Sequence, residues 1–210
     1  MKNKNVVLIG YSGHSYVVID ALKSMNNVVT AYCDQKEKGV NPFDLEYIGM
    51  EQSLEGIKVL KENDYFISVG DNSIRLSIYR TLKDLGLKEP INAIHQSSII
   101  GSKVSLGNGV YIGPNAIINA LSKIGTGSII NTSAVVEHEC VIGDFAHIGP
   151  AATLAGNVEI GEGTFVGANA VIKQNVRIGN HVVIGAGSVI IKDIPDHSVV
   201  VGNPQRFINE

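Results

Sequence analysis

Residues 123–154 read KIGTGSIINTSAVVEHECVIGDFAHIGPAATL, and an aliphatic residue recurs in this stretch at every sixth position. The same phase continues in both directions without a slip or an insertion, and the next residue is glycine at 10 of the 16 positions. The 16 positions are Ile100, Leu106, Ile112, Ile118, Ile124, Ile130, Val136, Ile142, Ile148, Leu154, Ile160, Val166, Ile172, Ile178, Ile184 and Ile190. An α-helix cannot keep such a stripe on one side, because six residues turn through about 600°.

A chain that makes a short strand and then a corner every six residues fits this period. The fourth residue after each aliphatic is small or branched, and it stands two residues before the next aliphatic. Residues two apart in an extended segment point to the same side, so both are expected to point inward. We expect the glycine to supply the permissive backbone of the corner. Three units would close a triangular coil, so the period predicts a hexapeptide parallel β-helix over residues 91–210.

Residues 1–90 show a different pattern, in which strands and helices alternate. This alternation predicts a small parallel sheet with helices on its faces, a Rossmann-like α/β domain. The segment 39–55 has the least pattern and is expected to be an irregular connection. The predicted strands are Val6–Ile9, Val28–Cys33 and Tyr65–Val69, and the predicted helices are Val17–Met25 and, approximately, Ser73–Leu85.

Composition and charge exclude several classes of protein. The net charge of −3 gives no electrostatic reason to expect a nucleic acid or a membrane surface as a partner. No apolar stretch approaches the ~18 residues of a membrane span. The apolar run Val6–Ile9 is too short for a signal peptide, and Cys33 and Cys140 suggest no disulfide framework. We therefore expect a cytoplasmic protein.

The pair His138 and Glu139 falls on corner positions, where the packing of the repeat does not require either side chain. Acyl transfer from a thioester needs a base that removes a proton from the nucleophile, and histidine changes charge near neutral pH. The neighbouring carboxylate can fix the imidazole tautomer and stabilise its protonated form. Cys140 occupies a small inward position, so we interpret it as core packing and not as a nucleophile. A scaffold or a sugar-nucleotide sensor without turnover is the non-enzymatic alternative.

The loop 10–14, GYSGH, follows a predicted strand and opens a helix, where backbone N–H groups and the helix dipole attract a phosphate. It departs from the G-x-G-x-x-G pattern at Ser12 and Tyr16, so a nucleotide sugar is favoured over a dinucleotide. Asp34 ends the second predicted strand and could accept a hydrogen bond from a base or a ribose. The segment 70–72, GDN, completes the carboxyl edge of the sheet, where ligands bind in open α/β folds.

The whole chain resembles the sialic acid O-acetyltransferase-like branch of the hexapeptide sugar acetyltransferases. It is most similar to the bacillosamine-pathway enzymes that N-acetylate a UDP-4-amino sugar in glycan biosynthesis. The motifs that carry the resemblance are GYSGH at 10–14, GDN at 70–72 with Arg75 nearby, NAIH at 92–95, INTSAVVEHECVIGDFAHIGP at 130–150 and VGNP at 201–204. The resemblance implies a left-handed β-helix, acetyl-CoA as co-substrate, no metal, and a homotrimer with active sites between subunits.

The resemblance also implies residue roles. His138 would be the general base and Glu139 the acid that orients it. The nucleotide sugar would contact Ser12, Gly13, His14, Asp34, Gln35 and Gly70, with Asn131 facing the acceptor sugar. Acetyl-CoA would contact His147, Ala168 and Ala186. Within this branch, N-acetylation of a UDP-4-amino-4,6-dideoxy sugar is the leading expectation, and O-acetylation of a sialic acid or N-acetylation of a GDP-linked sugar such as perosamine are the alternatives.

Overall fold

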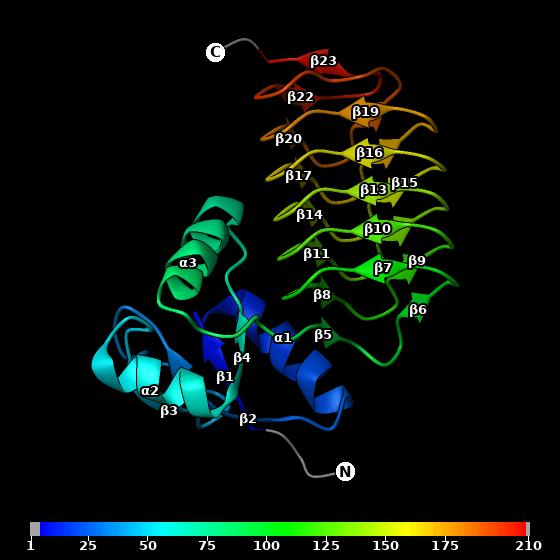
Figure 1. Cartoon of the computed structure of the whole chain (residues 1–210). Helices are drawn as coiled ribbons and strands as arrows, with labels where there is room; N and C mark the ends of the chain where they lie inside the picture. The colour runs from blue at the N-terminus through cyan, green and yellow to red at the C-terminus, as the bar shows by residue number, and fades with distance from the viewer. Residues whose placement is uncertain (1–4, 209–210) are drawn as a thin grey trace. The chain divides into compact units, whose positions relative to one another are not determined.

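The computed structural model describes residues 5–208, and the chain divides between Gln96 and Ser97 into two compact units (Figure 1). The first unit contains a four-stranded parallel sheet in the order β3-β2-β1-β4. Its strands are β1 (Asn5–Ile9), β2 (Val28–Cys33), β3 (Glu46–Gly49) and β4 (Asp64–Ile67), followed by the short β5 (Ala93–Ile94). Its helices are α1 (Gly13–Ser24), α2 (Leu54–Glu62) and α3 (Asn72–Asp84).

The alternation of strands and helices predicted for this unit is confirmed. The structure adds β3 and the beginning of α2, which lie in the segment expected to be irregular. Strand β3 is a four-residue edge strand without a fully buried side chain, and it ends at Gly49 with φ of 106°. A short, half-buried edge strand leaves almost no hydrophobic periodicity, so the sequence pattern missed it.

The second unit contains 16 two-residue strands, and each ends on one of the 16 aliphatic positions. Two further strands, β22 (Val199–Val201) and β23 (Arg206–Phe207), close the chain as an antiparallel pair. The 16 strands are β6 (Ile99–Ile100), β7 (Ser105–Leu106), β8 (Tyr111–Ile112), β9 (Ile117–Ile118), β10 (Lys123–Ile124), β11 (Ile129–Ile130), β12 (Val135–Val136), β13 (Val141–Ile142), β14 (His147–Ile148), β15 (Thr153–Leu154), β16 (Glu159–Ile160), β17 (Phe165–Val166), β18 (Val171–Ile172), β19 (Arg177–Ile178), β20 (Val183–Ile184) and β21 (Val189–Ile190).

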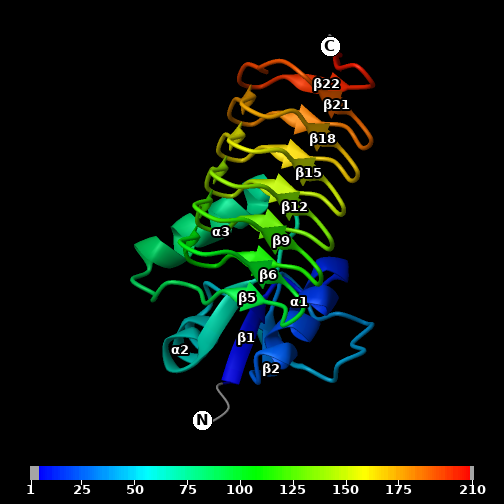
Figure 2. The ribbon, with the colours of Figure 1, turned by 90° about the vertical axis from the view of Figure 1, so that its right-hand side faces the viewer.

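Every third strand pairs in parallel with the next, so the coil has three faces (Figures 1 and 2). Face 1 contains β6, β9, β12, β15, β18 and β21, face 2 contains β7, β10, β13, β16 and β19, and face 3 contains β8, β11, β14, β17, β20 and β22. The pairing of Ile124 with Ile142 shows that one coil takes three hexapeptides. We name the edges by the faces they join: edge 1–2, edge 2–3 and edge 3–1. The predicted β-helix is confirmed.

The last coil is shorter than the others. Ile178 pairs with Ile194 and Ile184 pairs with Val200, so the spacing falls by two residues. Ile194, which the period placed at a small inward position, therefore stacks on an aliphatic position instead. The regular repeat ends just before the antiparallel β22–β23 pair.

The glycine that follows the aliphatic residue does not have the role that the sequence suggested. The left-handed residue lies two positions later, and in 15 repeats φ there is between 53° and 69°. The ten glycines themselves have ordinary φ values. A Cβ at Gly143 would lie 2.6 Å from the backbone nitrogen of Glu162 in the next coil. Close approach of stacked coils, and not backbone freedom, therefore requires these glycines.

We expect Gly143→Ala to destabilise the β-helix by about 1–3 kcal/mol, because its Cβ meets backbone that can move only by breaking the strand ladder. Urea unfolding followed by circular dichroism measures the change. The control is Lys173→Ala, which has the same place in its repeat but is exposed and already carries a side chain. It should change the free energy of unfolding by less than about 0.5 kcal/mol. Equal effects of the two variants would contradict the close-approach explanation.

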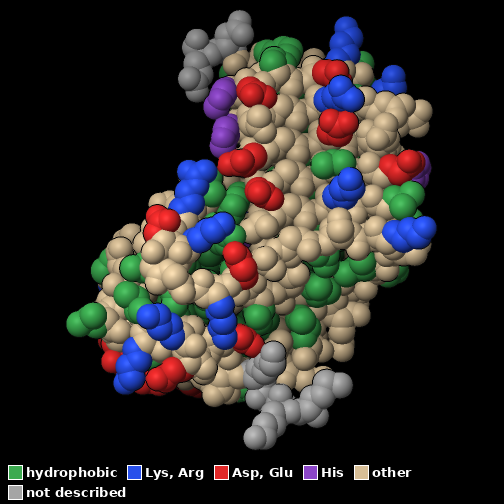
Figure 3. Space-filling view, in the orientation of Figure 1, with side chains coloured by type: hydrophobic (Ala, Val, Ile, Leu, Met, Phe, Trp, Pro, Cys, Tyr) green, Lys and Arg blue, Asp and Glu red, His purple; other side chains and the backbone are tan. Residues whose placement is uncertain are grey.

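Within residues 5–208, no helix combines the length and the apolar character needed to cross a bilayer. Acidic and basic side chains are interspersed on the face shown in Figure 3. This distribution agrees with the small net charge of the chain.

Candidate active site

One group of candidate site residues lies at the carboxyl edge of the parallel sheet in the first unit. Strands β2 and β3 lie on one side of β1 and β4 lies on the other, so the chain changes direction between β1 and β4. Such a switch point is where open α/β sheets bind ligands. The loop 10–12 leaves β1 there and leads into α1, and the loop 68–71 leaves β4. The sequence placed Ser12, Gly13, His14 and Gly70 at this edge, and the structure confirms the placement.

Direct contacts between the two loops hold them in place. Ser68 Oγ donates to the carbonyl oxygen of Gly10 at 2.6 Å. Gly10 has φ of 88°, and a Cβ there would lie 2.6 Å from Cγ2 of Val69. Only glycine fits this position, because its backbone is left-handed and the space for a side chain is filled.

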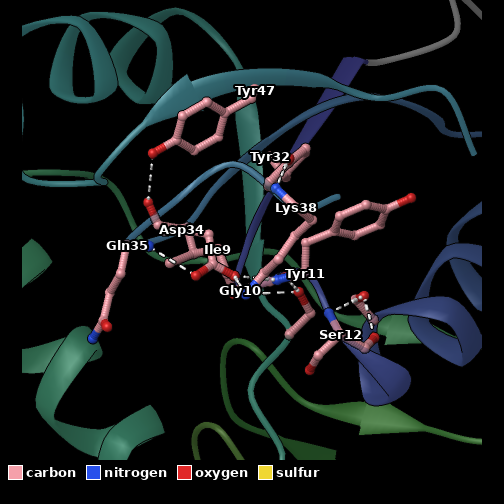
Figure 4. Close-up of polar contacts among 11 residues, drawn as sticks. Ile9, Gly10, Tyr11, Ser12, Tyr32, Asp34, Gln35, Lys38 and Tyr47 are labelled. Atoms are coloured by element: carbon pink, nitrogen blue, oxygen red, sulfur yellow. Dashed lines mark hydrogen bonds and ion pairs between the residues drawn. The ribbon is translucent and has the colours of Figure 1, made fainter. Parts of the chain in front are cut away.

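Asp34 ties the loop 10–12 to the end of β2 (Figure 4). Its Oδ2 accepts from the Tyr11 N–H at 3.0 Å and lies 2.9 Å from Nζ of Lys38, while Oδ1 accepts from the Gln35 N–H at 2.8 Å. A carboxylate offers about four acceptor directions, so roughly one remains for a nucleoside. The Gln35 side chain is exposed, and Figure 4 shows it directed away from this cluster. Asp34 is therefore first a support of the loop.

Arg75 holds the second loop from within α3. Its side chain is only 1% exposed. Nη1 donates to the carbonyl oxygens of Val69 and Gly70 at 2.9 and 3.0 Å, and Nη2 donates to Oδ1 of Asn72 at 2.8 Å. The sequence placed Arg75 near a motif but gave it no role. Periodicity does not identify a buried arginine within a helix, since charged residues are almost never fully buried unless they are paired and are therefore expected on the exposed face.

His14 is neutral in this environment. Burial, with a smaller contribution from the nearby positive charge of Arg75, lowers its pKa from 6.5 to about 4. The imidazole therefore adds no positive charge at neutral pH, and any attraction for a diphosphate comes from the amino-terminal end of α1. No acidic residue in the first turn of α1 opposes this attraction.

The lowered pKa of His14 predicts a pH dependence of stability. The unfolded chain takes up this proton near pH 6.5 and the folded chain only near pH 4, so stability should fall as the pH drops from about 6.5 towards 4. We expect His14→Asn to reduce the decrease in Tm between pH 7.5 and pH 5 measured by differential scanning calorimetry. His181→Asn, at an exposed histidine, should keep the wild-type decrease. A His14→Asn profile that superimposes on the wild-type profile would show that His14 is protonated normally.

A separate group of candidate site residues lies on the β-helix. His138 and Glu139 stand on edge 1–2, between β12 and β13, with 59% and 58% of their side chains exposed. Nδ1 of His138 lies 3.0 Å from Oε2 of Glu139. If Nδ1 carries the proton donated to the carboxylate, Nε2 keeps a free lone pair. Glu139 is held in a left-handed conformation with φ of 61°, so the corner itself directs its side chain.

Cys140 does not belong to this pair. Its side chain is fully buried, and Sγ donates to the carbonyl oxygen of Ala155 at 3.2 Å. Burial also raises the pKa of the thiol, which opposes formation of the thiolate. The interpretation of Cys140 as core packing is confirmed.

Asn131 and His147 form a second polar group, on face 3 and edge 3–1. Asn131 Oδ1 accepts from the Thr132 N–H at 2.8 Å, which leaves Nδ2 only 3.1 Å from Nε2 of His147. The ring of Phe165 packs edge-on against the His147 ring, with centroids 5.0 Å apart. This arrangement fixes the His147 ring on the outer surface of face 3.

Ala168 and Ala186 stack on the same edge 3–1 in successive coils. The Gly187 N–H donates to the carbonyl oxygen of Ala168 at 2.8 Å. Within one chain, the residues expected to contact acetyl-CoA therefore gather on edge 3–1 and face 3, and His138 and Glu139 lie on edge 1–2. The two edges bound opposite sides of face 1 (Figure 2). A single β-helix separates these two groups of predicted site residues.

Known proteins share both units. The PglD N-terminal domain family matches residues 5–82, and the bacterial transferase hexapeptide family (six repeats) matches residues 157–192. A histidine-to-asparagine variant of perosamine N-acetyltransferase from Caulobacter crescentus, solved with CoA and GDP-perosamine, is 36% identical to this chain. The alignment covers 98% of this chain and 97% of that one, with a TM-score of 0.92. The chain belongs to the hexapeptide-repeat sugar acetyltransferases.

Two further structures agree with this family. The acetyltransferase domain of PglB from Neisseria gonorrhoeae, solved with acetyl coenzyme A, is 33% identical over 99% of this chain and 100% of that one, with a TM-score of 0.90. WeeI from Acinetobacter baumannii AYE is 23% identical, covers 97% of this chain and 99% of that one, and has a TM-score of 0.86, which supports the fold alone. The resemblance inferred from the motifs is confirmed for the family and for its acetyltransferase activity.

Proposed function

We propose that this acetyltransferase transfers the acetyl group of acetyl-CoA to the amino group of a nucleotide-linked amino sugar. The observation that carries the proposal is the exposed imidazole of His138, whose Nδ1 lies 3.0 Å from the Glu139 carboxylate. This geometry leaves Nε2 to accept a proton. Two relatives more than 30% identical were solved with CoA or acetyl coenzyme A, which supports the donor.

The chemistry proceeds by direct transfer. Nε2 of His138 removes a proton from the attacking amine, and the amine nitrogen bonds to the thioester carbonyl carbon. The C–S bond then breaks, and the imidazolium returns the proton to the departing thiolate of CoA. Glu139 stabilises the imidazolium that forms between these steps. Cys140 forms no acyl intermediate, because its thiol is enclosed in the coil.

The nucleotide diphosphate is assigned to the switch-point edge of the first unit. Ser12, Gly13 and His14 present the beginning of α1, and Gly70 lies opposite, where a Cβ would be 3.8 Å from Cβ of His14. The absence of a side chain on Gly70 keeps this edge open for the diphosphate. Asp34 and Gln35 follow the end of β2 and are assigned to the nucleoside. The leading carrier is UDP with a 4-amino-4,6-dideoxy sugar, and the alternative is GDP, which the perosamine N-acetyltransferase complex supports.

We expect thiol release when the protein and acetyl-CoA are mixed with a UDP- or GDP-linked amino sugar, and none with free sialic acid. His138→Ala should lower kcat by about 10²- to 10⁴-fold, because the general base is lost. Ellman's reagent follows the thiol, and mass spectrometry identifies an N-acetylated or O-acetylated product.

The matched control is His181→Ala, another exposed corner histidine of the β-helix. It should keep wild-type kcat. A wild-type rate for His138→Ala would exclude His138 as the base, and transfer to sialic acid alone would replace the proposal with O-acetylation. Lack of turnover with every acceptor would favour the sensor interpretation.

The separation of the site residues on two edges supports a site that two copies complete. We propose a homotrimer in which edge 1–2 of one copy, with His138 and Glu139, faces edge 3–1 and face 3 of the next. There Ala168 and Ala186 would contact acetyl-CoA with His147, and Asn131 would face the acceptor sugar. A closed ring of three such heterologous contacts gives three sites.

The expected cytoplasmic location stays a prediction.

A complementation experiment tests this arrangement. His138→Ala removes the base, and Ala168→Trp blocks the surface assigned to acetyl-CoA, so each variant alone should be inactive. Trimers co-expressed from equal amounts of the two should recover about one quarter of wild-type activity, because about one site in four combines the two intact edges. A site within one chain would give no recovery. Size-exclusion chromatography with light scattering measures the oligomeric state of each sample.

A further inference from the structure

The imidazole of His138 lies against Gly156. These two residues have the same place in successive coils on edge 1–2, and the Asn157 N–H donates to the carbonyl oxygen of His138 at 2.9 Å. A Cβ built on Gly156 would lie 2.6 Å from Cε1 and 2.7 Å from Nε2 of His138. Real Cβ atoms do not approach other atoms so closely, so the ring occupies the space that a side chain at 156 would need.

The backbone does not require glycine at this position. Gly156 has an ordinary φ, unlike the left-handed residues of the corners. In the other 15 repeats, the same place carries a side chain. On edge 1–2 these residues are Ser102, Ala120, His138, Gln174 and Lys192. Gly156 is therefore the single glycine at its place in the repeat. It occupies the same corner as the proposed base, one coil later.

The neighbouring atoms separate Gly156 from the glycines that follow an aliphatic residue. Gly127 and Gly163 also lie against rings one coil later, those of Phe145 and His181, but both have a left-handed φ of 65°, a conformation that itself favours glycine. Nine of the ten glycines that follow an aliphatic residue lie on edges 2–3 and 3–1. At Gly143, a Cβ would meet backbone atoms of Glu162 and Gly161. At Gly156, the three nearest atoms all belong to the ring of His138. Packing of the coils explains the first group, and only the imidazole explains Gly156.

We propose that Gly156 is a positioning residue for the general base: its missing side chain leaves the space in which the His138 ring keeps Nδ1 on Glu139 and Nε2 free. The inference rests on the proposed role of His138. The His138 side chain is more than half exposed, so the ring has room to move outward. A methyl group at 156 would push it into solvent and away from the carboxylate, and the coil itself would not need to move.

Gly156→Ala tests the proposal. We expect kcat to fall by about 10- to 100-fold, because small displacements of a catalytic group cost about this much, while KM for acetyl-CoA stays within about twofold. The Tm should change little, since the new Cβ meets only a movable side chain. Gln174→Ala, an exposed residue one coil further along the same edge, is the matched control and should keep wild-type kcat.

The double variant His138→Ala/Gly156→Ala shows whether Gly156 acts through the ring. If it does, Gly156→Ala costs no further activity once the imidazole is gone. A further tenfold loss in the double variant would overturn the proposal, as would wild-type kcat in the single variant. The double variant should also be at least as stable as Gly156→Ala alone. A lower Tm would instead assign Gly156 a role in the backbone.

A nuclear magnetic resonance measurement decides the matter without turnover. Histidine labelled with ¹⁵N shows which ring nitrogen carries the proton, and the six histidines of the chain allow His138 to be assigned by its loss in His138→Ala. We expect the Nδ1–H tautomer in the wild type and a shift towards Nε2–H in Gly156→Ala. An unchanged tautomer ratio would contradict the inference. Failure of every acceptor in the activity assay would contradict the proposed function alone.

Discussion

Parallel pairing of each strand with the strand one coil later is the constraint on which the β-helix depends. With Ile124 beside Ile142 and Ile130 beside Ile148, every inward aliphatic stacks on another, and every corner stacks on the same corner of the neighbouring coil. Stacked corners leave no room for a Cβ where backbones come closest, which explains the glycines of edges 2–3 and 3–1. The same register sets which exposed residues become neighbours on the outer surface of the coil.

A rigid corner can orient a pair of side chains even where both are exposed. His138 and Glu139 are both more than half exposed, and an exposed hydrogen-bonded pair of this kind contributes little to stability. What orients them is the coil, through the left-handed backbone of Glu139 and the glycine beside the His138 ring. The chain therefore holds an imidazole in a defined direction on its outer surface, as the proposed role of His138 as a general base requires.

In the first unit, side-chain hydrogen bonds and not stacked coils hold the candidate site residues in place. Its ligand edge consists of loops, which sheet hydrogen bonds cannot hold, and buried polar side chains hold them instead. Ser68 joins the loops that follow β1 and β4, and Asp34 accepts a hydrogen bond from the Tyr11 N–H. The guanidinium of Arg75 donates hydrogen bonds to the carbonyl oxygens of Val69 and Gly70. These groups fix the loops before any ligand binds. Fixed loops lower the entropic cost of ordering that binding would otherwise carry.

The sequence alone determined the period of six, the 16 strands, the alternation of strands and helices in the first unit and the exposure of His138 and Glu139, because these follow from spacing along the chain. Only the tertiary structure decided which residues become neighbours across coils and loops. Gly156 is 18 positions from His138 in the sequence, and Asp34 is 23 positions from Tyr11, whose N–H it binds. Stacking and loop closure set these contacts. A repeat of six shows where each corner falls, but the contact between an imidazole and a missing side chain exists only once the coil has closed.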